Sequence, residues 1–126
     1  MKTYLITGGA GFIGSNYVSR LLKRGEKVII FDNLSRDGSR RNVEWLREQH
    51  GHDSFQLVID DVRKPEQLKS LANEADVMVH LAAQVAVTTS VTHPRDDFEV
   101  NALGTFNALE AARASKKKPV FLYAST

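Results

Sequence analysis

Apolar residues follow two different periods along this chain. Short apolar runs, rich in β-branched residues, indicate strands covered on both faces, because a strand with one wet face would alternate. Between these runs apolar residues return every three or four positions, the period of a helix with one buried face; in the last helix Leu103, Phe106 and Leu109 carry it. The strands expected from this pattern span residues 4–6, 28–31, 55–59, 77–80 and 119–123, and the helices span 13–24, 41–50, 65–72 and 96–115.

Strand and helix patterns alternate from one end of the chain to the other. This order predicts a parallel sheet with right-handed crossovers, so the fold class is α/β. Polar loops are expected at residues 33–39 and 81–94, the second with room for a helical turn. The final residues, Ala124-Ser125-Thr126, follow a strand at the sheet edge where open α/β sheets bind ligands. A natural domain rarely ends there, so we expect a truncated chain with apolar surface exposed on its fifth strand.

Composition narrows the class of protein. The chain has 126 residues, enough for one domain, and 17 basic against 15 acidic residues give a formal charge of only +2. This small excess argues against nucleic-acid or membrane partners. The chain has no cysteine, which excludes disulfides and a thiol nucleophile, and the His50 and His52 pair lies in a turn, so we expect no metal site. Neither a signal peptide nor a membrane-spanning run is recognisable, which predicts a cytoplasmic protein.

A glycine-rich turn joins the first strand to the first helix. It reads Thr7-Gly8-Gly9-Ala10-Gly11-Phe12-Ile13-Gly14. We expect Gly8 to allow the tight turn, Gly11 to let the backbone approach a pyrophosphate, and Gly14 to bring the helix close to the sheet. The helix N-terminus then offers N–H groups and a positive dipole end to the phosphates. The strand before this turn and the helix after it distinguish the motif from an ordinary glycine turn.

An acidic residue at the end of the second strand indicates which ligand the turn serves. Asp32 lies about 20 residues beyond the glycines, where a carboxylate accepts hydrogen bonds from the adenosine ribose of a dinucleotide. Its charge would repel a 2′-phosphate, which favours NAD over NADP. Arg36 lies four residues further on and could bind that phosphate, so NADP stays open as the alternative.

Polar residues after the third and fourth strands each have a structural alternative. Asp61 could accept a hydrogen bond from the adenine amino group, or belong to a solvated turn or a helix cap. His80 ends the fourth strand and is expected to be structural rather than a catalytic base. Thr88, Thr89 and Ser90 could line a sugar pocket or form an ordinary polar loop.

Taken together, these motifs resemble the extended short-chain dehydrogenases/reductases, the NAD-dependent epimerase/dehydratase family. The resemblance rests on the Thr7–Gly14 loop, Asp32-Asn33-Leu34, Asp61-Val62-Arg63, His80-Leu81-Ala82-Ala83 and the helix over Asn101–Arg113. It implies a Rossmann-type doubly wound sheet of five parallel strands in the order 3-2-1-4-5. Residues 1–126 would then be an incomplete NAD-binding domain that lacks C-terminal strands and the substrate region.

Within this family, residues 31–36, residues 83–90 and Trp45-Leu46 are similar to the CDP-paratose (CDP-tyvelose) 2-epimerases. The resemblance implies an NAD-dependent nucleotide-sugar epimerase, which removes a hydride from a sugar carbon and returns it to the other face. Its substrate would be a CDP-sugar, and the parent enzyme would be a homo-oligomer. Other nucleotide-sugar epimerases, 4,6-dehydratases and a non-catalytic dinucleotide-binding module stay open as alternatives.

The resemblance also assigns roles to individual residues. A Ser or Thr, a Tyr and a Lys carry the proton chemistry in the family. The hydroxyl maps to Thr126, with Ser125 as the neighbouring alternative, and no tyrosine of this chain has a lysine four positions later, so we expect the 126 residues alone to be inactive. The expected substrate residues are Thr88, Thr89 and Ser90. The expected cofactor-binding residues are Gly8, Gly11, Phe12, Ile13, Gly14, Asp32, Asn33, Ser35, Arg36, Asp61, Val62, Leu81, Ala82, Ala83, Gln84, Asn101 and Ser125.

Overall fold

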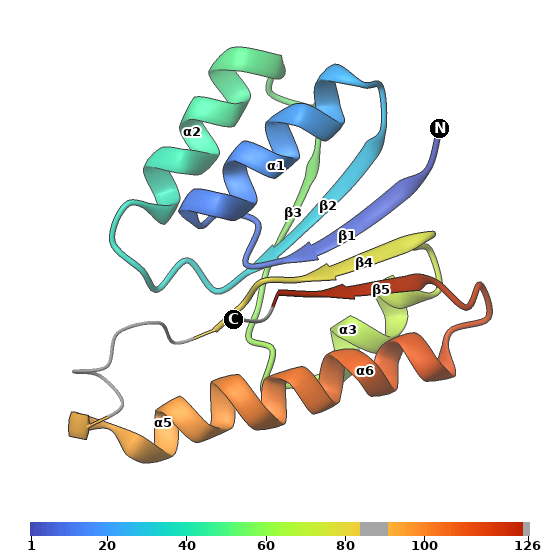
Figure 1. The fold of residues 1–126 in the computed structure, drawn as a ribbon. Coiled ribbons are helices and arrows are strands. Elements are labelled where there is room, and N and C mark those ends of the chain that lie inside the picture. Colours follow the sequence, from blue (N-terminus) through green and yellow to red (C-terminus); the bar gives the residue numbers. More distant parts are fainter. Residues whose placement is uncertain (84–90, 125–126) are drawn as a thin grey trace.

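A computed structural model describes residues 1–83 and 91–124 (Figure 1). In this part of the chain five parallel strands form one sheet, in the predicted order β3-β2-β1-β4-β5. The strands are β1 (Thr3–Thr7), β2 (Lys27–Asp32), β3 (Gln56–Ile59), β4 (Val77–His80) and β5 (Val120–Tyr123). The helices are α1 (Phe12–Lys23), α2 (Ser39–His50), α3 (Pro65–Ala72), α5 (Pro94–Phe98), the π-helical turn η1 (Glu99–Leu103) and α6 (Gly104–Ala114).

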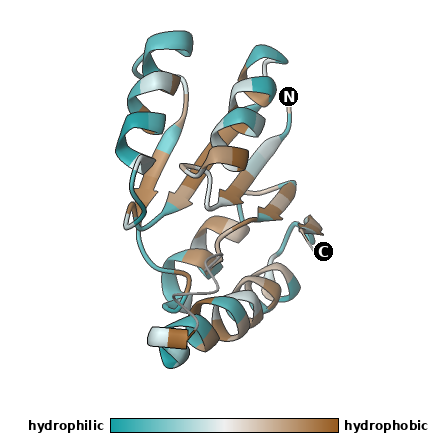
Figure 2. Ribbon diagram, turned by 60° about the vertical axis from the view of Figure 1, so that its left-hand side comes forward, coloured by the Kyte–Doolittle hydropathy of each residue, from teal (hydrophilic) through white to brown (hydrophobic). Residues whose placement is uncertain are grey.

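Helices cover both faces of the sheet, α1 and α2 on one side and α3 and α6 on the other (Figure 1). Neighbouring strand residues alternate between the two cores: Ile30 packs with the first pair of helices, and Phe31 packs with the second. The strands are accordingly apolar between outer helix faces that are largely hydrophilic (Figure 2). Full burial of each such side chain contributes about 1.5–3 kcal/mol. The doubly wound α/β fold predicted from the sequence is therefore confirmed.

The last helix differs from its prediction in three ways: it begins at another residue, it is interrupted, and it buries another face. It begins at Pro94, because proline is well suited to a first helical position, and η1 interrupts it before α6. The expected buried stripe is wrong, since Phe106 is 58% exposed and Leu109 is 48% exposed. Small residues such as Ala108 and Ala111 are buried instead. Spacing of large apolar residues could not reveal a helix that packs through its small ones.

The remaining elements agree with the predictions to within two residues at each end. Apolar exposure on the fifth strand is also confirmed, because Val120, Leu122 and Tyr123 all stand exposed at the edge of the sheet. None of the helices in the described ranges is long and apolar enough to cross a membrane. Location in the cell stays a prediction.

Candidate functional site

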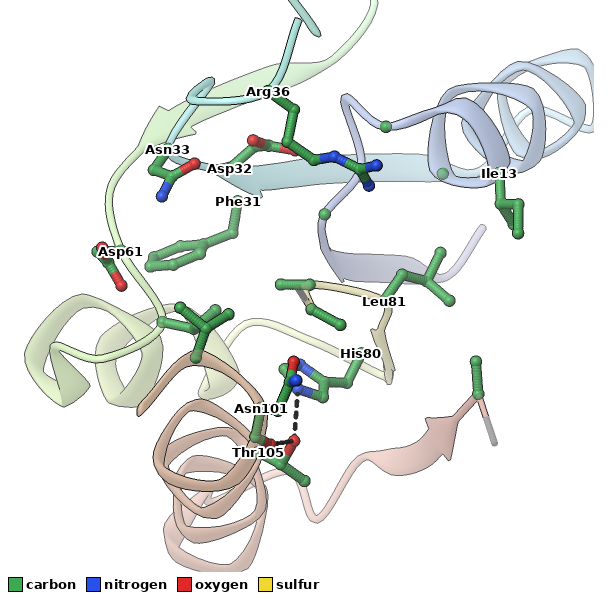
Figure 3. Close-up of a pocket in the computed structure, with 18 of the residues that line it drawn as sticks. Ile13, Phe31, Asp32, Asn33, Arg36, Asp61, His80, Leu81, Asn101 and Thr105 are labelled. Carbon is green, nitrogen blue, oxygen red and sulfur yellow. Dashed lines mark hydrogen bonds between the residues drawn. The ribbon is translucent and has the colours of Figure 1, made fainter. Parts of the chain in front are cut away.

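A cavity of about 740 Å³ opens at the carboxyl ends of all five strands (Figure 3). The sheet order reverses between β1 and β4, and open α/β sheets bind ligands beside such a switch point. The turn η1 and the start of α6 form the wall opposite the glycine loop. The cavity is lined by Gly8, Gly11, Phe12, Ile13, Gly14, Phe31, Asp32, Asn33, Ser35, Arg36, Asp60, Asp61, Val62, His80, Leu81, Ala82, Ala83, Val100, Asn101, Thr105, Tyr123 and Ala124.

Glycines allow the loop after β1 to pack against its neighbours without side chains. Gly8 has φ +73°, and a Cβ there would lie 2.8 Å from the backbone nitrogen of Ala82. A Cβ on Gly14 would overlap the carbonyl oxygen of Gly8, so α1 could not begin so close to the strand. Gly11 caps α1 without a side-chain hydrogen bond, which leaves the first-turn N–H groups beside the cavity without a side-chain cap.

Gly9 contributes to this packing in a way that the glycine spacing did not reveal. A Cβ on Gly9 would lie 2.9 Å from the Cγ2 atom of Ile30, so the loop also rests directly on β2. Asn42 of α2 donates from Nδ2 to the carbonyl oxygen of Ala10 (2.8 Å), another contact that the sequence pattern did not predict. The loop is therefore held by β2 and α2 as well as by its own turn.

The carboxylate of Asp32 is fixed at the cavity wall by two backbone donors. Its Oδ2 accepts from Ala10 N–H (3.0 Å), and its Oδ1 accepts from Leu34 N–H (2.8 Å). Each carboxylate oxygen can accept a further hydrogen bond, so the group can meet two more donors from the cavity. Figure 3 shows Arg36 on the same wall as Asp32. The acid expected to favour NAD and the arginine that could bind the 2′-phosphate of NADP therefore lie close together.

Asp61 is held by Arg63 at the end of β3. Its Oδ1 accepts from the Arg63 backbone N–H (2.9 Å) and Nε (3.0 Å), and its Oδ2 accepts from Nη2 (2.7 Å). Hydrogen bonds from Arg63 hold the pKa of the Asp61 carboxyl below its usual value. The helix-cap alternative is wrong because Lys64 precedes α3, and the solvated-turn alternative fits poorly because the Asp61 side chain is only 16% exposed. Contact with adenine stays a prediction.

His80 is buried at the end of β4 between two threonines. Its Nδ1 lies 2.6 Å from Thr7 Oγ1, and its Nε2 lies 3.0 Å from Thr105 Oγ1 (Figure 3). Burial lowers the pKa of the imidazole to about 4, so the ring is neutral at ordinary pH. This agrees with the structural role expected for His80. Sequence reasoning did not identify Thr7 and Thr105 as its partners.

The structure brings most of the expected cofactor residues to one cavity, although their binding roles stay predictions. All the expected residues that it describes line the cavity. Gln84, Thr88, Thr89, Ser90, Ser125 and Thr126 lie outside the described residues. The sequence missed Phe31, Asp60, His80, Val100, Thr105, Tyr123 and Ala124 as lining residues. Most of these adjoin predicted residues at strand ends, so the strand-end position itself was the signal that could have found them.

His50 at the end of α2 and His52 just after it do not form a metal site with the described residues around them. His50 Nε2 lies 2.8 Å from Ser19 Oγ, which ties α2 to α1. Within residues 1–83 and 91–124, no three His, Asp or Glu side chains come together so that they could hold a metal ion.

Known proteins resemble this chain in both sequence and fold. A family model described as GDP-mannose 4,6 dehydratase matches residues 5–126. The CDP-paratose 2-epimerase of Salmonella typhi is 44% identical over 124 residues, covering 97% of this chain and 36% of that protein. A similar fold is found in the crystal structure of a UDP-glucose 4-epimerase from Stenotrophomonas maltophila with bound NAD and formylated UDP-arabinopyranose. The TM-score is 0.86 at 28% identity, and the match covers 100% of this chain and 37% of the epimerase chain.

A second solved structure, the UDP-glucose 4-epimerase of Thermus thermophilus in complex with NAD, has a TM-score of 0.74 at 42% identity. The match covers 88% of this chain and 33% of the Thermus thermophilus chain. This chain therefore spans about a third of the length of these relatives. Because the family model matches nearly all of the sequence, the chain belongs to the GDP-mannose 4,6 dehydratase family, within the extended short-chain dehydrogenases/reductases.

Proposed function

We propose that the cavity binds NAD and that this chain is the NAD-binding portion of a nucleotide-sugar epimerase. One observation carries the proposal: an Asp32 carboxylate with spare acceptor capacity lies in the same cavity as a glycine loop whose close contacts leave no room for side chains. The first feature suits a ribose diol and the second suits a pyrophosphate, which are adjacent parts of a dinucleotide. The two UDP-glucose 4-epimerase structures contain NAD, which supports the same cofactor here.

The residues present fit this cofactor. Phosphate oxygens would meet the first turn of α1, where N–H groups and the helix dipole favour negative charge. The ribose hydroxyls would donate to Asp32, and the negative charge of this residue disfavours a 2′-phosphate, so NAD is preferred over NADP. Val100 and Asn101 line the opposite wall of the cavity, where the nicotinamide half would lie.

When bound, NAD supplies a hydride acceptor and donor for a sugar carbon. The residues of this chain bind and orient the cofactor. The proton chemistry is assigned to Thr126 together with a Tyr and a Lys of the longer protein, which this chain does not contain. The 126 residues are therefore inactive by themselves, and the proposed domain is one part of a larger catalytic unit.

The substrate is a nucleotide-sugar, and we assign it to the CDP-sugars. The support for this finer assignment is the 44% identity to the Salmonella typhi CDP-paratose 2-epimerase. Epimerases acting on UDP-sugars, and 4,6-dehydratases, are the competing members of the same family. The parent enzyme is expected to be cytoplasmic and homo-oligomeric, and the exposed Phe106 and Leu109 on α6 are consistent with burial in a larger assembly.

Assays on a longer chain separate these activities. A protein that extends this sequence through a Tyr-x-x-x-Lys motif should convert CDP-paratose to CDP-tyvelose, followed by proton NMR of the sugar, because both halves of the site are then present. The 126-residue chain is the matched control and should give no turnover. Conversion of UDP-glucose instead of the CDP-sugar would reject the substrate assignment. Turnover by the 126 residues alone would reject the proposal that catalysis needs a Tyr and a Lys outside them.

A further inference from the structure

A continuous path of hydrogen bonds crosses the floor of the cavity through His80. It starts at Thr7 in β1, passes through both nitrogens of the imidazole, and reaches Thr105 at the start of α6. The Thr105 hydroxyl then donates to the carbonyl oxygen of Asn101 in η1 (2.6 Å). Figure 3 shows His80, Thr105 and Asn101 side by side below the cavity. Elements on both sides of the switch point are thus connected by side chains.

The partners of Thr7 determine which imidazole nitrogen carries the proton. Thr7 Oγ1 accepts from Ala82 N–H (3.2 Å), and it shares Leu81 N–H (3.1 Å) with the carbonyl oxygen of Thr7. A hydroxyl oxygen has two lone pairs, so these two donors occupy both of them. Its single O–H must then donate to Nδ1 of His80, which makes Nδ1 an acceptor without a proton. The proton of a neutral ring therefore lies on Nε2 and is donated to Thr105 Oγ1.

This arrangement fixes three pieces of the cavity wall relative to one another. Thr7 is the last residue before the glycine loop, and its hydroxyl holds the backbone of Leu81 and Ala82 just after β4. This placement requires a glycine at position 8, because a Cβ there would collide with the backbone of Leu81 and Ala82. Through Thr105 the path also reaches η1, which carries Asn101 on the opposite wall. Stacking of the His80 ring on Tyr123 (6.1 Å between centroids, 16° between planes) holds the imidazole in place from β5.

We propose that His80 is a positioning residue for the dinucleotide site: as the neutral Nε2–H tautomer, it holds the glycine loop and the η1–α6 wall at the separation that the dinucleotide requires. This inference rests on the proposed function, because it concerns binding at the same cavity. His80 acts through Thr7 and Thr105, and it transfers no proton to or from the ligand. Imidazolium could not serve in this role, since a proton on Nδ1 would face an oxygen whose lone pairs are already used.

The tautomer can be observed directly in the 126-residue chain. Long-range ¹H–¹⁵N correlation spectra of ¹⁵N-labelled protein should show His80 with an unprotonated Nδ1 and a protonated Nε2 throughout pH 8 to 6. The exposed His52 gives a second histidine signal in the same spectra for comparison. An Nδ1–H tautomer, or an imidazolium at His80 in this range, would overturn the inference, whether or not NAD binds.

Paired substitutions at Thr105 test the positioning role. Thr105→Val keeps the shape but removes the acceptor for Nε2–H, whereas Thr105→Ser retains the hydroxyl. By calorimetry at pH 7.5, we expect the NAD dissociation constant to rise about tenfold in T105V and to stay within about twofold of the original in T105S, with a folded-state circular dichroism spectrum in both. Equal NAD binding by the original chain and T105V would overturn this inference alone. Failure of the unsubstituted chain to bind NAD would overturn the proposed function, and with it this role.

Discussion

Asp32 combines a structural role with the proposed ligand-binding role in one side chain. Its two oxygens accept from Ala10 and Leu34, so the carboxylate is oriented before any ligand arrives. A group that is already oriented loses little conformational entropy on binding, which strengthens its contribution to affinity. The same contacts mean that substitution of Asp32 also removes support from the glycine loop. A test at this residue therefore has to include a measurement of folding.

The neutral state of His80 has a consequence for stability. The unfolded chain takes up a proton on this histidine below about pH 6.5, whereas burial keeps the folded chain from doing so until about pH 4. The contribution of His80 to the free energy of unfolding should therefore be constant above pH 6.5 and fall as the pH is lowered from 6.5 to 4, by about 3 kcal/mol. Urea denaturation at pH 7 and pH 4.5 measures this change.

The matched variant for this experiment is His80→Phe, which keeps an aromatic ring but has no titrating group. Its free energy of unfolding is expected to be lower at pH 7 but to change much less between the two pH values. Asp61 and Asp76, whose pKa values are lowered by hydrogen bonds, lose their contributions only at still lower pH. An identical pH dependence in both proteins would show that His80 is not the group responsible.

At the scale of elements, the α3–α6 layer shows that small residues can decide how helices pack. Gly104 opens α6 against the loop after β3, and a Cβ there would lie 2.6 Å from Val62 Cγ2. Asn107, one turn further on, donates to the carbonyl oxygen of Val62 (2.9 Å). These contacts hold the loop that carries Asp61 at the cavity. The position of Asp61 is thus set by α6, which is remote from it in the sequence.

This packing predicts that the smaller of two substitutions on the same helix is the more destabilising one. Gly104→Ala should lower the free energy of unfolding by about 1–3 kcal/mol, because the added methyl group has no space beside Val62. Phe106→Ala removes a far larger side chain but should cost less than about 1 kcal/mol, since the Phe106 ring is mostly exposed. Chemical denaturation of both variants gives the comparison. A larger loss for F106A than for G104A would support the stripe of large apolar residues that the sequence suggested.

The elements also show how far sequence reasoning reaches. Apolar runs and helical periods predict nearly every strand and helix, because β1, β2 and β4 are buried on both faces and most helices bury large side chains. The same reasoning fails at α6, where the buried residues are Gly104, Asn107, Ala108 and Ala111. The π-helical turn η1 was not predicted either, since a single inserted residue leaves no mark on the apolar spacing.

For the whole molecule, the sheet topology explains why a site could be predicted at all. Parallel strands bring their carboxyl ends to one edge, so Gly8, Asp32, Asp61 and His80 meet there although they are far apart in the sequence. Their residue types and positions were readable from the motifs. Their hydrogen-bond partners were not, because Asn42 and Thr105 come from helices whose approach depends on tertiary packing. Prediction therefore reached the residues of the cavity better than the contacts that orient them.

We propose that this molecule binds NAD at the cavity through Asp32 and the glycine loop. Isothermal titration calorimetry of the 126-residue chain with NAD tests it most directly, with NADP as the competing ligand and Asp53→Ala as the matched control for Asp32→Ala. We expect saturable NAD binding and weaker binding of NADP. D32A should lose one or more kcal/mol of NAD affinity while it keeps its folded spectrum, and D53A should bind NAD unchanged. Absence of NAD binding, or equal NAD affinity in D32A and the original chain, would contradict the claim.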